Sequence, residues 1–266
     1  MADNLRTYSK ANPEKELLPP QVIKPVEAEA YAVPPIQIQT EDYQKQDLDV
    51  MPKAFFILIS GGEAREKDYF KIISFHDKFK RIKLEFIADP QKLAPDGMFE
   101  LAEYKKARYN SSKNTDEEPD KIYLISDVDD FMTELLQIKP KCTEEGFRLI
   151  ISNSCFEVWL YYAYCDTLPS FKIPTDYLKI SSKFKGWLPS AIRGGVKTTR
   201  AILNIYQNIE NAKANYKEDK NGIPALFSTN MFELALDLIP LIEPELTNMI
   251  EENKRIEAAF RERKKK

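Results

Sequence analysis

The chain has 266 residues, of which 43% are hydrophobic, 30% are charged and only 8 are glycine. This composition supports a sizeable buried core and favours a helix-rich α/β protein over a β-sandwich. The formal net charge of −3 argues against a globally basic nucleic-acid binder, but it leaves room for a local basic face.

The residue content also excludes several kinds of site. The chain has one histidine, His76, and three cysteines without a C-x-x-C spacing. These numbers exclude a His-rich zinc site and argue against a Ser-His-Asp triad. No apolar run approaches the ~20 residues of a membrane span, and the N-terminus lacks the profile of a signal peptide. We therefore expect a soluble, cytoplasmic protein with no membrane partner.

Residues 1–50 contain six prolines among polar and charged residues, without a helical or strand periodicity. This pattern predicts an extended or disordered arm. Whether the arm becomes ordered on a partner is left open.

Regular structure is expected from Ala54 onward. The continuous apolar run 54–59 predicts a strand that is buried on both faces. Helices and strands then alternate, with helices at 64–77, 95–109 and 131–145 and strands at 82–87, 121–126 and 147–152. This alternation predicts an α/β core over residues 51–165, with a parallel sheet flanked by helices. Residues 166–266 are expected to form a mostly helical lobe packed on that core.

Acidic side chains follow three of the predicted strands: Glu63 and Glu66 after the first, Asp127, Asp129 and Asp130 after the third, and Glu157 after the fourth. Open α/β sheets bind their ligands beyond the carboxyl ends of the strands. We therefore expect these carboxylates to gather at one edge of the sheet.

Carboxylate oxygens in this arrangement favour Mg²⁺ or Mn²⁺. The expected metal ligands are Asp127, Asp129 and Asp130. A metal bound there would polarise a phosphodiester and stabilise the leaving oxygen. The simpler alternative is that these aspartates only cap the helix that begins near residue 131.

These clusters resemble the RloB-like family, a branch of TOPRIM-like proteins in bacterial defence loci. The resemblance covers roughly residues 54–240 and rests on four segments in order. They are Gly62-Glu63-x-x-Glu66-x-x-Tyr69-Phe70, Asp127-x-Asp129-Asp130-Phe131, Ser152 to Leu160, and Ser228-Thr229-Asn230-Met231.

The resemblance implies a TOPRIM-like parallel sheet in which Asp127 and Asp129 bind Mg²⁺. It also implies an acidic residue after the first strand that assists proton transfer. Similar proteins are typically encoded beside an AAA/ABC-type ATPase and act in anti-phage abortive infection, where related effectors are nucleases. The expected substrate is therefore RNA, including tRNA, or DNA.

One departure bears on catalysis. The family usually has Glu-Gly-Glu after the first strand, whereas this chain has Gly61-Gly62-Glu63. Glu63 or Glu66 is expected to substitute for the missing acid, and Glu157 is expected to complete the site.

A basic segment follows in the helical lobe. Residues 177–209 contain no Asp or Glu. The candidate nucleic-acid contacts in this segment are Lys183, Lys185, Trp187, Arg193, Lys197 and Arg200. Cations interleaved with aromatic rings favour phosphate contacts and base stacking. The alternative is a solvated face whose aromatic residues belong to the core.

Two functional hypotheses follow from the sequence. In the first, the protein is a metal-dependent nuclease gated by its ATPase partner. In the second, it is a catalytically degenerate subunit that binds the ATPase or nucleic acid without cleaving. The oligomeric state is left open, including a homo-oligomer.

Overall fold

A four-stranded parallel sheet lies at the centre of the computed structural model, which describes residues 53–62, 64–75, 78–88, 93–111, 119–129, 131–193 and 195–263. The strands are β1 (Ala54–Ser60), β2 (Ile82–Ala88), β3 (Lys121–Asp127) and β4 (Arg148–Ser152), in the order β2-β1-β3-β4. The expected α/β fold with a parallel sheet is thus confirmed. The arm expected over residues 1–50 lies outside the described residues.

The apolar run of β1 is explained by burial on both faces of the sheet. Phe55, Ile57 and Ile59 belong to one hydrophobic cluster, whereas Phe56 and Leu58 belong to the other. Successive side chains of a strand point to opposite faces, so a strand covered on both sides must be apolar at every position.

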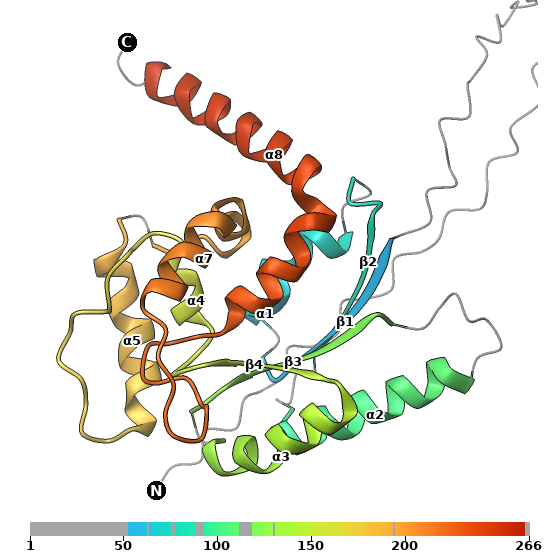
Figure 1. The fold of residues 1–266 in the computed structure, drawn as a ribbon. Helices are drawn as coiled ribbons and strands as arrows, with labels where there is room; N and C mark the ends of the chain where they lie inside the picture. The colour runs from blue at the N-terminus through green and yellow to red at the C-terminus, as the bar shows by residue number, and fades with distance from the viewer. Residues whose placement is uncertain are drawn as a thin grey trace, which may run out of the picture. The chain divides into compact units, whose positions relative to one another are not determined.

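Helices cover both faces of the sheet (Figure 1). The helices α2 (Pro95–Ser111) and α3 (Met132–Glu145) pack on the face of Ile57. The helices α1 (Ala64–Phe75) and α4 (Glu157–Tyr162) pack on the face of Leu58. The observed ends of α1, α2 and α3 lie close to those expected from the sequence.

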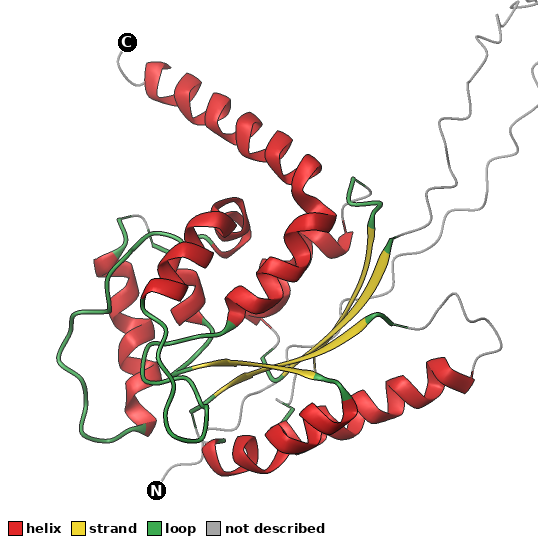
Figure 2. Ribbon diagram, viewed as in Figure 1, coloured by secondary structure: helices red, strands yellow, loops and turns green. Residues whose placement is uncertain are grey.

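The C-terminal part is helical, as expected (Figure 2). Its elements are α5 (Leu178–Ala191), α6 (Thr198–Ala201), the 3₁₀ helix η2 (Ile202–Asn204), α7 (Ile205–Ala214) and α8 (Met231–Arg263). The hydrophobic cluster on the Leu58 face continues through Trp159 into Phe184 of α5 and Leu234 of α8. The helical part and the sheet therefore share one core.

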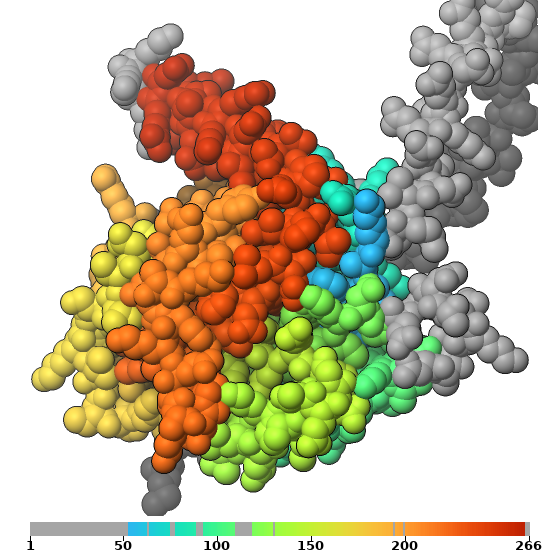
Figure 3. Space-filling view, viewed as in Figure 1, coloured from blue at the N-terminus to red at the C-terminus, as the bar shows by residue number. Residues whose placement is uncertain are grey.

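The long helix α8 has two different halves. Its buried residues end at Leu246, and the rest of the helix extends past the surface formed by α7 (Figure 3). Within the described part of the chain, no helix combines the length and apolar character that a membrane span requires.

Candidate functional site at the carboxyl ends of the strands

The carboxyl ends of β1, β3 and β4 meet at one edge of the sheet. Ser60 pairs with Ile125, and the backbone N–H of Gly61 donates to the Ile125 carbonyl over 3.0 Å. Asp127, the last residue of β3, pairs with Ser152 at the end of β4. The register therefore brings the residues that follow β1 to about the level of Asp127.

Glu66 lies in the first turn of α1 and is buried, with 7% of its surface exposed. Its carboxyl group lies against Gly62, where a Cβ atom would overlap it. The glycine at position 62 therefore lets this carboxyl approach the end of β1.

Two effects oppose each other at the Glu66 carboxyl. Burial raises its pKa above the ordinary value, and the charge of Glu157 adds to the increase. The backbone N–H groups of Glu66 and Arg65, and the nearby ammonium of Lys185, lower the pKa in part. Glu66 thus interacts favourably with the N-terminus of α1, and it also belongs to the acidic cluster.

Asp127 has the most perturbed carboxyl group of the site. Burial raises its pKa well above the usual range, and the negative charges of Glu66, Glu157 and Asp129 raise it further. The ammonium of Lys185 acts in the opposite direction. Glu66, Glu157 and Asp129 therefore each disfavour a negative charge on Asp127, which makes Asp127 the common partner of these carboxylates.

Backbone hydrogen bonds attach the loop after β3 to the end of β4. The N–H of Val128 donates to the Ser152 carbonyl over 3.1 Å, and the N–H of Asp129 donates to the Ser154 carbonyl over 3.4 Å. These bonds hold Asp127 and Asp129 beside the start of α4.

Glu157, in the first turn of α4, lies between two cations. Its side chain is 12% exposed, and its oxygens lie 4.0 Å from Arg65 Nε and 3.5 Å from Lys185 Nζ. Arg65 also donates from Nη1 to Thr198 Oγ1 over 3.0 Å. One carboxylate therefore links α1, α4 and α5, and Arg65 extends this link to α6.

The ammonium of Lys185 lies among the acidic groups. Burial alone would lower its pKa, but nearby groups raise the pKa above its ordinary value, namely Cys155, Glu157, Asp127 and Asp129. Lys185, which the sequence placed on a nucleic-acid face, thus faces the carboxylates.

Two of the expected site residues, Glu63 and Asp130, lie outside the described residues. Among the described residues, no group of three or more His, Cys, Asp or Glu side chains is close enough to hold a metal ion. The donor chemistry nevertheless fits Mg²⁺ or Mn²⁺, because Asp127 and Asp129 supply carboxylate oxygens. The raised pKa of Asp127 also reflects crowded negative charge, which a divalent cation would relieve.

Comparison with known families identifies the chain. The family model described as RloB-like protein matches residues 56–238. The chain belongs to the RloB-like family. Comparisons with curated proteins and with solved structures find no match.

The last of the four RloB-like segments completes the sheet edge. Thr229 forms an isolated antiparallel bridge with Ser152, and their hydroxyl oxygens lie 2.8 Å apart. The Asn230 side chain accepts from the N–H of Ile151 over 2.6 Å and donates to the Leu149 carbonyl over 3.1 Å. This segment therefore covers the open edge of β4.

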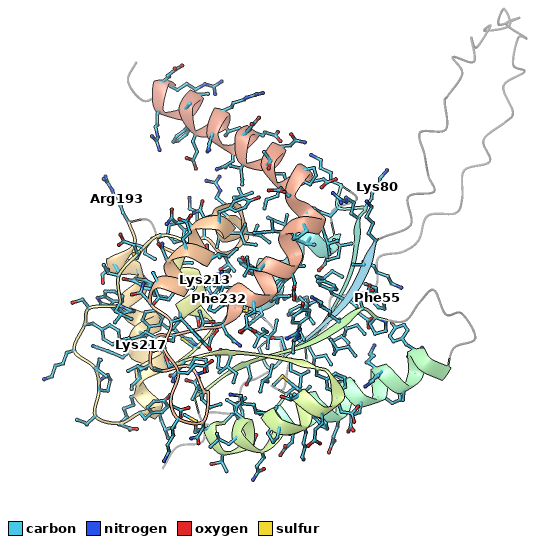
Figure 4. The ribbon with its side chains drawn as sticks, viewed as in Figure 1. Phe55, Lys80, Arg193, Lys213, Lys217 and Phe232 are labelled. Atoms are coloured by element: carbon cyan, nitrogen blue, oxygen red, sulfur yellow. The ribbon has the colours of Figure 1, made fainter. Side chains whose placement is uncertain are left out.

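The residues of the basic segment have different surroundings in this RloB-like protein. Trp187 packs among aromatic rings, with its centroid 5.2 Å from that of Phe171, and Lys183 is exposed on α5. The other three cations, Arg193, Lys197 and Arg200, line a pocket of about 200 Å³ beside α8. Arg193 extends outward from the end of α5 (Figure 4).

Sequence reasoning missed Arg65, which contacts both Glu157 and Thr198. Its position directly before Glu66 in the first turn of a helix was the only signal in the sequence. That signal is weak. A cation at a helix N-terminus interacts unfavourably with the helix dipole, so the sequence alone suggests a solvated side chain.

Proposed function

We propose that this RloB-like protein is a cytoplasmic, Mg²⁺-dependent nuclease with a TOPRIM-like site. In this proposal it acts on RNA, including tRNA, or on DNA as the effector of an ATPase-gated anti-phage defence. The observation that carries the proposal is the electrostatic coupling of Asp127 with Glu66, Glu157 and Asp129 at the carboxyl edge of a parallel sheet. Membership of the RloB-like family supports it.

The chain's own residues have distinct roles in this proposal. Asp127 and Asp129 would hold the divalent ion, which when bound would polarise the phosphodiester. Glu66 would transfer a proton, because burial raises the pKa of its carboxyl above the ordinary value, and a raised carboxyl pKa favours general acid–base catalysis. The Glu66 carboxyl lies against Gly62, next to the end of β1. The family's usual glutamate would stand close by, at residue 61, where this chain has glycine.

The direct test uses the purified protein, alone and with its ATPase partner, on labelled RNA and DNA in Mg²⁺ or Mn²⁺. We expect cleavage that Asp127→Ala abolishes and that Glu66→Gln slows by about 10²–10⁴-fold. Lys141→Gln on α3 is the control, because α3 covers the opposite face of the sheet, and it should cleave at the wild-type rate. If no nucleic acid is cut in either metal with the partner present, the nuclease proposal fails.

The alternative is a subunit that binds the ATPase or nucleic acid without cleaving. The observation that favours it is at Gly61, where a Cβ atom would lie only 3.0 Å from the Leu93 carbonyl oxygen. The end of β1 thus has little room for the usual glutamate. This alternative predicts that Asp127→Ala, once shown to be folded, still protects cells from phage. Loss of protection in that variant contradicts it.

A further inference from the structure

The cation within the carboxylate cluster belongs to the protein itself. Lys185 Nζ lies 3.5 Å from Glu157 Oε2, and its charge acts on Asp127 and Glu66 as well. A lysine that served only a nucleic-acid face would direct its ammonium toward solvent. Here the ammonium forms an ion pair with Glu157 instead, and the charges of Asp127 and Asp129 also act on it.

The packing of α5 explains this direction. Ser181 lies one turn before Lys185 and is buried, as are Ile180, Phe184 and Leu188 of the same helix. Residues four apart share one face of a helix, and helical side chains lean toward the N-terminus. The face that carries Ser181 therefore turns Lys185 toward Glu157 of α4, while the Lys185 side chain remains 43% exposed.

We propose that Lys185 balances the charge of the carboxylate cluster in the metal-free protein and is displaced when a divalent ion binds. Two cations near the same carboxylates repel each other, so the ammonium must move outward before the ion can take its place. Its exposed fraction leaves a path toward solvent. Lys185 is thus a gate on metal binding, and this role rests on the metal site of the proposed function.

The gate makes a prediction that does not depend on catalysis. Removing the ammonium should tighten Mg²⁺ or Mn²⁺ binding by about tenfold, which corresponds to the repulsion of a divalent ion by one charge about 6 Å away in water. Lys185→Gln removes the charge with a similar chain length. Lys185→Arg keeps the charge and should bind metal as the wild type does.

The experiment measures Mn²⁺ and Mg²⁺ affinity by calorimetry on the full-length protein and on four variants. They are Lys185→Gln, Lys185→Arg, Lys141→Gln and the double variant Lys185→Gln/Asp127→Asn, each checked for folding by circular dichroism. The gate predicts tighter metal binding in Lys185→Gln alone. In the double variant, which lacks the Asp127 carboxylate, this gain in affinity should be lost. Lys141→Gln removes the same charge from the opposite face and should bind metal unchanged.

The outcomes separate the two proposals. If the wild type and Lys185→Gln bind metal with equal affinity through Asp127, the gate is wrong and the metal site stands. If Lys185→Arg or Lys141→Gln tightens binding as much as Lys185→Gln, the effect is not the local charge and the gate is also wrong. If no variant binds metal, the proposed metal site itself fails, and the gate fails with it.

Discussion

Two polar clusters lie on either side of the carboxyl end of β4. They differ in how the burial of their polar groups is compensated. In the cluster of Asn153, Thr229 and Asn230, the side chains find hydrogen-bond partners at 2.6–3.1 Å. In the cluster of Glu66 and Asp127, burial and like charges raise the pKa values of the carboxyls.

This difference indicates that the first cluster stabilises the fold and that the second is a candidate functional site. Neutral polar groups with complete hydrogen bonding stabilise a fold, because their desolvation is compensated. Crowded buried carboxylates cost stability, and their persistence marks a candidate functional site. The comparison can be tested by changing one residue at a time in each cluster.

The largest effect is expected at Asn230, where Asn230→Ala removes two hydrogen bonds and leaves the buried N–H of Ile151 without its partner. We expect a loss of about 2–4 kcal/mol in the free energy of unfolding, measured by urea denaturation. Asn221→Ala, in an exposed turn with a side-chain contact of 3.4 Å, is the control and should change stability by less than about 0.5 kcal/mol. Equal losses in both variants would contradict a structural role for Asn230.

A smaller effect of opposite sign is expected at Asp127. Asp127→Asn removes a carboxyl group whose charged form is disfavoured by burial and by the neighbouring carboxylates. We therefore expect the metal-free protein to become more stable at neutral pH, by less than the loss expected for Asn230→Ala. Thermal melts in EDTA measure the gain, and added Mg²⁺ should raise the melting temperature of the wild type only. A variant that melts below the wild type in EDTA would show that Asp127 is structural.

The same carboxyl predicts a pH dependence. Because the pKa of Asp127 is raised in the folded state, the unfolded chain loses this proton first as the pH rises through about 4. Folding stability of the wild type should therefore fall relative to Asp127→Asn as the pH rises from about 4. Urea titrations of both proteins in EDTA at several pH values measure this difference. A difference that is constant with pH would refute the raised pKa.

The smallest effect is expected at Arg65, whose side chain is 54% exposed beside Glu157. Arg65→Gln should cost less than about 1 kcal/mol, because exposed ion pairs are weak and screened by salt. Urea denaturation at low and high salt measures the cost, which should shrink as salt is added. A larger, salt-independent loss would place Arg65 among the structural residues.

Most of the fold could be predicted from the sequence. The strand at β1 followed from an unbroken apolar run, and the end of α3 was expected at residue 145, where Gly146 adopts a left-handed conformation with φ 77°. Such features depend on residues that are neighbours in the chain. The position of Asp127 at the edge of the sheet followed from the same local pattern and the strand alternation.

The partners of the site residues could not be predicted in the same way. Lys185 and Trp187 are two residues apart in one basic segment, yet the first faces Glu157 and the second packs on Phe171. Their different surroundings depend on how α5 is rotated against the sheet, which no periodicity in the segment specifies.

The sequence by itself determined the alternation of strands and helices and the family, because hydrophobic period and local motifs are properties of short segments. Only the tertiary structure decided that Glu66 lies against Gly62, that Lys185 lies among the carboxylates and that Arg65 contacts Glu157. Glu66 and Gly62 are only four residues apart, but the contacts of Lys185 and Arg65 join residues distant in the chain. These distant contacts form only when the helices dock at particular angles on the sheet.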